Sequence, residues 1–236
     1  DVAKATDTIF LSVPDGPISL SVIDEVIATS DRRAGVIIDL STIGPEAARE
    51  AAKRCADAGF VYIDSPVSGG QAGARAATIA VMLAGPKDVV DAHMDVLKGF
   101  AKNPFHVGEL AGQGQAVKIL NNFLSGTALA ASVEAVLYGL SAGVDMKTIV
   151  DVVSVSSGYN SAIREKFPAR IMTETFDAGF ATALQSKDIN LYLENAKSAG
   201  TPSRIGQLVC DMWDEHNEAR PGSDITHMYE FIRDGE

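Results

Sequence analysis

A lysine and an asparagine stand one helical turn apart in the stretch Gly112 to Phe123, which opens the longest apolar segment of the chain. Between Gln113 and Val144 the only charged residues are Lys118 and Glu134. A helix that is apolar on every side is expected to be buried, and a buried ammonium group is costly unless it is paired or loses its proton. Asn122 follows Lys118 at i+4 and lies on the same helix face. The two residues predict a site that binds one small polar group.

Two loops follow predicted strands, where an open α/β sheet binds its ligands. The first loop, Val13-Pro14-Asp15, could pass close to a cofactor or could be a simple turn. The second loop, Leu40-Ser41-Thr42, could offer a hydroxyl and free backbone amides to a ribose or a nicotinamide, or could cap the helix that follows. Residue types alone leave these alternatives open.

A third loop, Ser65-Pro66-Val67-Ser68-Gly69-Gly70, is more specific. Its two glycines leave backbone N–H groups unshielded beside a serine hydroxyl, which predicts a concavity suited to a carboxylate. The alternative is a glycine turn that joins two strands. A carboxylate cradle and Lys118, brought together at a domain boundary, would form a site for a small hydroxy acid.

A fourth candidate is Lys187-Asp188, within a predicted helix from Thr182 to Ala199. The lysine could reach a cofactor, although a solvated charge on the helix face is the commoner outcome of such a pattern. The four histidines have no spacing that suggests a metal site, and we predict none.

Hydrophobic patterns in the first half of the chain alternate between strands and helices, which predicts a parallel sheet wrapped by helices. The predicted strands are Thr8–Val13, Gly35–Leu40, Phe60–Ile63, Thr78–Ala84 and Phe105–Val107, and the helices are Ile18–Thr29, Pro45–Ala58 and Lys87–Phe100. After Gly108 only helical patterns follow: the long segment to about Val144, then Met146–Ser156, Ser161–Met172, Thr182–Ala199, Arg204–Glu218 and Asp224–Ile232. The sequence therefore predicts an α/β part followed by an all-helical part, divided near Glu109 to Gly112.

Composition restricts the class of protein. The 236 residues are 46% hydrophobic, enough for a substantial core, and the formal net charge is −11. An acidic surface repels phosphate backbones and anionic membranes, so we expect no nucleic-acid partner and no membrane partner. Cys55 and Cys210 are far apart in sequence and are expected to be packing residues. We expect a cytoplasmic protein, and we expect that the chain begins inside a domain, because it starts close to a buried strand.

These motifs together resemble those of the β-hydroxyacid dehydrogenase family, which includes 3-hydroxyisobutyrate dehydrogenase and tartronate semialdehyde reductase. Asp64 to Gly70 (DSPVSGG) resembles the substrate-binding motif of the family, Gly112 to Asn122 (GQGQAVKILNN) its catalytic motif, and Lys187-Asp188 a cofactor and substrate contact of its helical domain. The resemblance covers essentially the whole chain. It implies that residues 1–110 are the C-terminal portion of an NAD(P)-binding Rossmann-like domain. Residues 111–236 would then form a helical substrate and oligomerisation domain, with a long helix between the two.

The resemblance also implies a role for each candidate residue. Lys118 would be the general acid/base and Asn122 would orient the substrate. The remaining residues divide between the substrate, bound by Ser68, Gly69, Gly70 and Asp188, and the cofactor NAD or NADP, bound by Pro14, Thr42 and Lys187. A homodimer or homotetramer would form through the helical domain.

The main departure from the family is that no G-x-G-x-x-G turn follows a first strand, so the chain as given is expected to bind NAD(P) poorly. Three other assignments share parts of this pattern. A 6-phosphogluconate dehydrogenase would have a longer helical domain and phosphate-binding basic residues, which are not found here. Imine reductases typically lack the lysine. A non-catalytic binding or oligomerisation module is disfavoured for the full-length protein by Lys118 together with the Ser68-Gly69-Gly70 cradle, and stays open for the chain as given.

Overall fold

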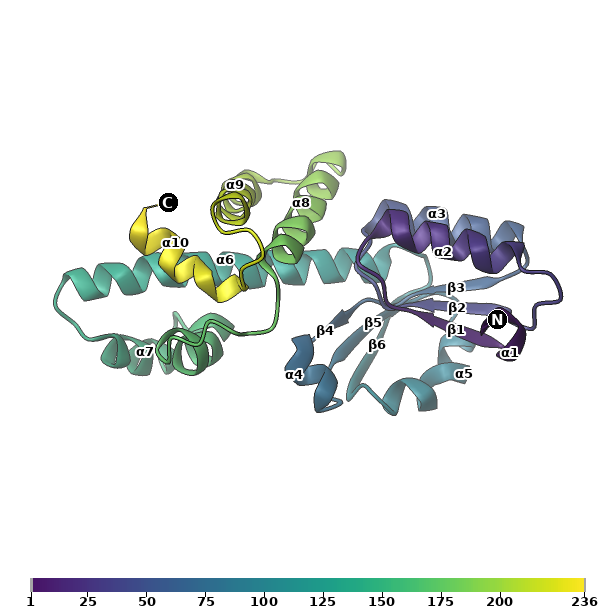
Figure 1. Cartoon of the computed structure of the whole chain (residues 1–236), viewed down its shortest axis with the longest axis horizontal. Helices are drawn as coiled ribbons and strands as arrows, with labels where there is room; N and C mark the ends of the chain where they lie inside the picture. Colours follow the sequence, from purple (N-terminus) through teal and green to yellow (C-terminus); the bar gives the residue numbers. More distant parts are fainter. Residues whose placement is uncertain (1, 236) are drawn as a thin grey trace. The chain divides into compact units, whose positions relative to one another are not determined.

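The computed structural model describes residues 2–235, and Figure 1 traces them in sequence colours. By their internal contacts the described residues divide into two compact units, of which unit 1 ends at Ile119 and unit 2 begins at Leu120. The division falls inside one helix, α6 (Gln113–Ser141), so the first turns of this helix belong to unit 1 and the rest to unit 2. The domain boundary predicted at residues 110 and 111 remains a prediction.

Unit 1 is built on one six-stranded sheet with the order β1-β2-β3-β5-β4, in which β6 also pairs with β5. The strands are β1 (Thr8–Leu11), β2 (Val36–Asp39), β3 (Val61–Asp64), β4 (Val67–Ser68), β5 (Ala80–Ala84) and β6 (Asn103–Gly108). Strands β1, β2 and β3 are parallel, as are β5 and β6, whereas β5 runs antiparallel to β3 and β4.

The predicted fold class, α/β followed by all-α, is confirmed, but the sheet is mixed rather than parallel throughout. The reason lies in the connection from β3 to β5, which holds only the two-residue strand β4 and the six-residue helix α4 (Gly70–Arg75). A parallel pair needs a crossover with a helix long enough to return the chain along the sheet. Without one, β5 runs back beside β3.

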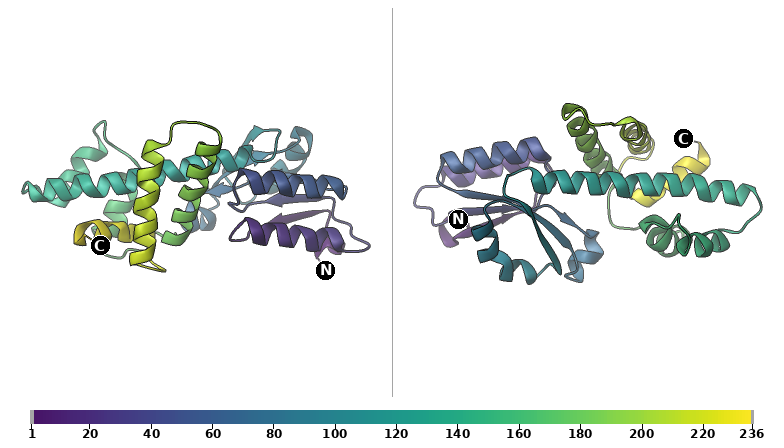
Figure 2. Two further views of the ribbon diagram at one scale, coloured as in Figure 1. Left: turned by 90° about the horizontal axis from the view of Figure 1, so that it is seen from above. Right: turned by 180° about the vertical axis from the view of Figure 1, so that it is seen from behind.

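Helices cover both faces of the sheet in unit 1. Helices α2 (Gly16–Ala28) and α3 (Pro45–Asp57) lie on one face and α5 (Lys87–Lys98) on the other, as Figures 1 and 2 show. Side chains alternate accordingly: Ile37 belongs to the cluster beneath α2 and α3, whereas its neighbour Ile38 packs on the side of α5. Three short elements were not predicted: α1 (Val2–Ala5), β4 and α4.

Unit 2 is entirely helical apart from one isolated β-bridge. It holds the remainder of α6, then α7 (Met146–Ser154), the π-helix η1 (Ala162–Ile171), α8 (Thr182–Ser198), α9 (Arg204–Ala219), the short 3₁₀ helix η2 (Ile225–His227) and α10 (Met228–Asp234). Helices α8 and α9 lie side by side (Figures 1 and 2). The core of this unit is formed by large apolar side chains that are almost completely buried, among them Leu129, Val133, Phe167, Ile189, Trp213 and Met228.

Helix α6 is long and apolar enough, by length and hydropathy alone, to cross a membrane. The core helix of a soluble protein passes the same test. Leu129, Val133 and Val136 on α6 are part of the core of unit 2, which is what a core helix requires.

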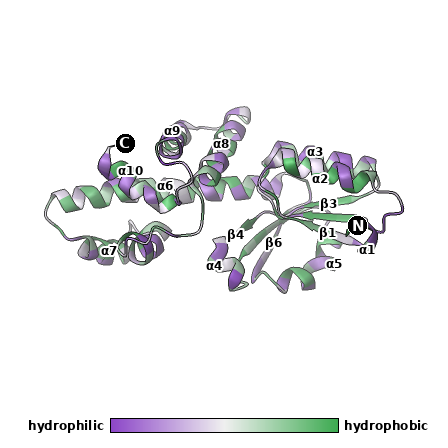
Figure 3. Cartoon of the chain, in the orientation of Figure 1, coloured by the Kyte–Doolittle hydropathy of each residue, from purple (hydrophilic) through white to green (hydrophobic). Residues whose placement is uncertain are grey.

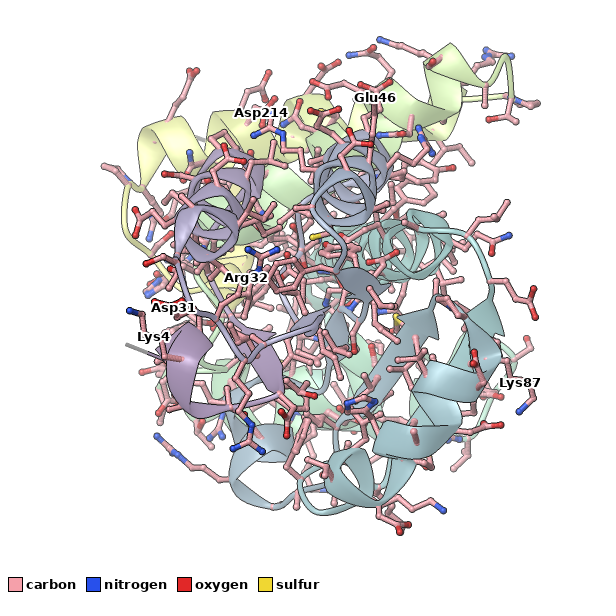
Figure 4. All side chains as sticks on the ribbon, turned by 90° about the vertical axis from the view of Figure 1, so that its right-hand side faces the viewer. Lys4, Asp31, Arg32, Glu46, Lys87 and Asp214 are labelled. Carbon is pink, nitrogen blue, oxygen red and sulfur yellow. The ribbon has the colours of Figure 1, made fainter. Side chains whose placement is uncertain are left out.

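Charged side chains lie mainly on the outer faces of the helices. Figure 4 shows Lys4, Glu46 and Lys87 pointing away from the ribbon, and Figure 3 shows hydrophobic residues along the strands and an alternation of hydrophobic and hydrophilic residues on α2 and α3. Cys55 and Cys210 are free and buried, as predicted. The few charged side chains in the interior therefore stand out.

Candidate functional site

Among the described residues, four lysine or acidic side chains are buried: Asp39, Asp64, Lys118 and Asp188. Burying a charge costs free energy unless it is paired or hydrogen-bonded, so each of the four needs a reason. Two of them, Lys118 and Asp188, are residues that the sequence motifs single out. The other two, Asp39 and Asp64, are the last residues of strands β2 and β3.

The start of α6 is fixed by its glycines and by Asp64. Gly112 has a φ of +94°, and a Cβ added there would stand 3.0 Å from the carbonyl oxygen of Pro45. The Asp64 carboxylate accepts hydrogen bonds of 3.0 Å from the backbone N–H groups of Gly112 and Gln115, which lie at the opening of the helix. The first N–H groups of a helix have no partner within it, so this carboxylate satisfies them as a capping residue does.

The charge on Asp64 is opposed by its surroundings. Burial raises the pKa of Asp64 from 3.8 to about 6. Hydrogen bonds from Gln115 and Gly112 favour the charged form and partly offset the rise, while the nearby Asp39 adds to it. Desolvation is the larger effect, so the carboxylate is kept at the strand end at a cost in stability.

Lys118 lies on the last turn of α6 within unit 1 and is 8% exposed. Asn122 follows one turn later, at the start of unit 2, and is also buried. Within unit 2 the side-chain amide of Asn122 donates a 2.5 Å hydrogen bond to Asp188, and its backbone carbonyl accepts from the side chain of Gln185 at 2.9 Å. Asn122 is therefore held on both its side chain and its backbone.

Lys187 is half-buried rather than fully solvated on the helix face. Its Nζ lies 3.0 Å from Asp188 Oδ1 as an ion pair. Asp188 thus has one oxygen toward Lys187 and the other toward Asn122. In the helical unit these three predicted residues form one polar group.

The two predicted cofactor loops leave β1 and β2 at the same edge of the sheet. Pro14 is exposed, and Asp15 after it accepts a hydrogen bond from the N–H of Ile18 as the N-cap of α2. Thr42 is half-buried. The loop after β2 does not cap α3 through a side chain, because the N-cap residue is Gly44 with a φ of +82°.

Two of the three backbone amides in the second loop are used within the fold. The N–H of Leu40 donates to the carbonyl of Leu11 at 2.8 Å, and the N–H of Ser41 donates to Asp39 at 2.9 Å. The alternative in which the loop offers a set of free amides is therefore excluded for Leu40 and Ser41.

The predicted carboxylate cradle lies at the junction between β4 and α4. Ser68 is half-buried in β4, opposite Ala80 of β5, while Gly69 and Gly70 are exposed. Both glycines have positive φ, +134° and +61°, a backbone conformation that other residues rarely adopt. The sequence alternative, a glycine turn directly between two strands, is replaced by a turn into a short helix.

Sequence reasoning missed Gln115, which is completely buried and contacts the loop after β2 as well as Asp64. Its signal was present: an uncharged amide in the same apolar helix as Lys118 needs partners for the same reason. Asp39 was missed as well, because its contacts to Ser19 and Tyr62 join segments that are more than a dozen residues apart in sequence. Among the described residues no group of three or more His, Cys, Asp or Glu residues could hold a metal ion.

Comparisons with known proteins cover nearly the whole chain. The family model described as the NAD binding domain of 6-phosphogluconate dehydrogenase matches residues 1–108. The family model described as NAD-binding of NADP-dependent 3-hydroxyisobutyrate dehydrogenase matches residues 112–232.

Individual relatives agree with these matches. The chain is 36% identical over 215 residues to 2-(hydroxymethyl)glutarate dehydrogenase of Eubacterium barkeri, a match that covers 90% of this chain and 71% of the relative. It is 35% identical over 207 residues to 3-hydroxyisobutyrate dehydrogenase of Pseudomonas aeruginosa, covering 84% of this chain and 69% of the relative. A solved structure of Mycobacterium tuberculosis 3-hydroxyisobutyrate dehydrogenase with L-serine has a TM-score of 0.89 at 27% identity, covering 98% of this chain and 81% of that chain.

Proposed function

Since the chain belongs to the β-hydroxyacid dehydrogenase family of NAD(P)-dependent enzymes, we propose that it transfers a hydride between NAD or NADP and a small β-hydroxy acid or its semialdehyde. The observation that carries this proposal is the buried Lys118 on α6, one turn before an asparagine that is fixed by Asp188. Burial of an ammonium group in an apolar helix lowers the stability of the fold, whereas the same group can donate or accept a proton in a reaction.

Lys118 is the general acid/base in this proposal. When bound, the nicotinamide supplies the hydride acceptor or donor. In oxidation Lys118 in its neutral form takes the proton of the substrate hydroxyl as the carbinol C–H bond breaks. In reduction its ammonium form gives a proton to the carbonyl oxygen. Asn122 orients the substrate, and its own side chain is oriented by Asp188.

The substrate carboxylate is assigned to Ser68, which is half-buried in β4, and to the exposed Gly69 and Gly70 that follow it. Asp188 is assigned to the substrate as well. A site that combines a carboxylate cradle with a lysine at a fixed position selects short acids in which hydroxyl and carboxylate are separated by a short carbon chain.

The cofactor is assigned to Pro14, Thr42 and Lys187. The loops that carry Pro14 and Thr42 fit a dinucleotide, because they leave parallel strands β1 and β2 at their carboxyl ends, where an open α/β sheet binds its ligands. We further propose that residues 1–110 belong to the cofactor domain and residues 111–236 to the substrate and oligomerisation domain. The two family matches, which meet between residues 108 and 112, support this division.

We also propose a cytoplasmic homodimer or homotetramer. Helix α6 exposes Leu124 and Tyr138 at 59% and 76%, and Val155 after α7 is 85% exposed. Apolar side chains with that exposure on a helical unit favour contact with another subunit.

Replacement of Lys118 tests the catalytic assignment. General acid–base groups typically contribute 10²–10⁴-fold, so we expect Lys118→Ala to lower kcat by at least about 100-fold while cofactor affinity stays nearly unchanged. Steady-state rates of the full-length protein on a panel of hydroxy acids and semialdehydes, with NAD and NADP, measure the first, and NAD(P)H fluorescence titration of the full-length protein measures the second. The matched control is Lys147→Ala, since Lys147 is exposed and pairs with Asp151 on the surface. Retention of a tenth of kcat in the Lys118 variant would refute the assignment.

A further inference from the structure

Gln115 uses every hydrogen-bonding position of its side chain within unit 1. Its Oε1 accepts from the backbone N–H groups of Ile43 and Gly44 at 2.9 and 3.1 Å, and its Nε2 donates to Asp64 Oδ1 at 2.7 Å and to the carbonyl of Ser41 at 3.0 Å. A primary amide has two acceptor positions and two donor hydrogens, so the side chain is saturated. A single buried residue thus joins the loop after β2 to the end of β3.

The same residue is tied to the helix through its backbone. Asp64 accepts from Gln115 Nε2 with one oxygen and from the backbone N–H groups of Gly112 and Gln115 with the other. Gly114 lies between these two residues, and a Cβ there would overlap the carbonyl oxygen of Met82 and stand 3.0 Å from Asp64. The first turn of α6 is therefore packed directly against the sheet and cannot move without breaking these contacts.

The contacts extend to the first cofactor loop through Ser41, whose hydroxyl accepts from the backbone N–H of Val13 at 2.8 Å. Ser41 and Gln115 thus connect the loops after β1 and β2. Thr42 lies between residues that Gln115 binds, and Lys118 follows Gln115 by three residues on the same rigid helix.

We propose that Gln115 is a positioning residue for the reaction: it fixes the Thr42 loop and the first turn of α6 in one arrangement, so that Lys118 keeps a constant place relative to the cofactor loop. The inference rests on the role proposed above for Lys118. A displacement of about 1 Å at a reacting group can lower a rate by about 100-fold, which is the scale on which such positioning acts. A buried amide that only stabilised the fold would change stability without this effect on turnover.

Exchange of the two functional groups tests the proposal. Gln115→Glu sets a carboxylate against the carboxylate of Asp64. Asp64→Asn leaves one acceptor oxygen where Asp64 uses two, so it cannot accept both from Gln115 Nε2 and from the backbone N–H groups of Gly112 and Gln115. Each single variant therefore breaks one part of the network. In the double variant Asp64→Asn/Gln115→Glu the amide introduced at position 64 donates to the carboxylate introduced at position 115 and accepts from the backbone N–H groups of α6. The carboxylate still accepts from Ile43 and Gly44 and loses only the hydrogen bond to the carbonyl of Ser41, so recovery is partial. We expect each single variant to lower kcat by about 10- to 100-fold with a smaller change in KM, and the double variant to recover at least tenfold over the worse single variant.

Amide hydrogen exchange of Ile43 and Gly44 gives a readout that does not depend on turnover. Exchange should accelerate in the single variants and slow again in the double variant. Thr8→Val is the matched control, because it removes a part-buried 2.8 Å hydrogen bond to His93 at the opposite end of β1, in the same unit, without touching Gln115, Ser41 or Thr42. It should lower the melting temperature and leave kcat within about threefold of wild type. Gln115→Met, of similar length and uncharged, replaces Gln115→Glu if the latter does not fold.

Two outcomes would overturn the proposal: a folded Gln115 variant with kcat within threefold of wild type, or a double variant no better than the worse single one in both kcat and amide protection. Failure of the proposed function is recognised separately. If Lys118→Ala keeps its activity, the catalytic assignment is wrong whatever the Gln115 variants do. If Lys118→Ala is inactive and Gln115→Met is fully active, only the positioning role is wrong.

Discussion

The buried carboxylate of Asp64 predicts a specific dependence of stability on pH. Burial raises its pKa to about 6 in the folded chain, against 3.8 for an ordinary aspartate. A group whose folded pKa lies above its unfolded pKa stabilises the fold fully below the unfolded value, and that stability is lost as pH rises through the folded value. At about 1.4 kcal/mol per pH unit, the difference corresponds to roughly 3 kcal/mol, lost mainly between pH 4 and pH 6.

The perturbation is Asp64→Asn, which removes the titrating group. Urea unfolding followed by circular dichroism at several pH values from 4 to 8 gives the free energy of unfolding of both proteins. Other carboxylates titrate in the same range in both, so only the difference between the two proteins is diagnostic. We expect the stability of wild type minus that of the variant to fall by about 2.5 kcal/mol from pH 4 to pH 7, since pH 4 already lies just above the unfolded pKa, and to change little above that.

The single tryptophan, Trp213, lies in unit 2 and provides an internal reference, because Asp64 lies in unit 1. Where unit 2 unfolds in a separate transition, its fluorescence midpoint should show the same pH dependence in both proteins. A difference in stability that is constant from pH 4 to pH 7, or that rises with pH, would refute the reasoning that desolvation outweighs the hydrogen bonds from Gln115 and Gly112.

Two further predictions concern unit 2. Gly126→Ala should destabilise it by about 1–3 kcal/mol by thermal or urea unfolding, since the added methyl would stand 2.7 Å from a buried carbon of Ile189, and overpacking outweighs the gain in helix propensity of at most about 1 kcal/mol. Gly158→Ala is the control, because its nearest neighbour is 3.5 Å away, and equal stability of the two variants would contradict the packing argument. Light scattering at micromolar concentration should give two or four times the chain mass, and Tyr138→Glu should lower it, whereas a monomeric wild type would refute the proposed assembly.

The sequence predicted the larger elements because their signals are local. Strand and helix patterns at Thr8–Val13, Pro45–Ala58 and Thr182–Ala199 agree with the observed elements to within a few residues at their ends. The errors lie where tertiary contacts decide. Strand β4 is two residues long, and its pairing with β5 and the antiparallel course of β5 depend on the short connection through α4, which no periodicity reveals.

Of the residues at the candidate site, likewise, those with a local signal were predicted and those fixed by distant contacts were not. Lys118 was found because a charge in an apolar helix is anomalous in the sequence itself, and its burial agrees with that interpretation. Gln115 was missed because an uncharged amide is a weaker anomaly, although a fully buried amide needs four hydrogen bonds. Three of its four partners lie more than 70 residues away in sequence, and the fourth, Asp64, is 51 residues away. Spacing along the chain carries no information about such contacts.

The glycines of the stretch Gly112 to Asn122 are visible in the sequence, but their structural role depends on contacts with the sheet. Read as sequence, GQGQAVKILNN is a pattern that resembles a catalytic motif. In the structure Gly112 supplies a positive φ, Gly114 allows the helix to approach the carbonyl of Met82, and Gln115 occupies the contact that this approach creates. A larger residue at position 114 would hold the helix away from Asp64 and so would remove the hydrogen bonds through which Gln115 acts. The spacing from Gly114 to Lys118 therefore expresses one geometric requirement: the helix must lie against the sheet before its lysine can have a fixed position.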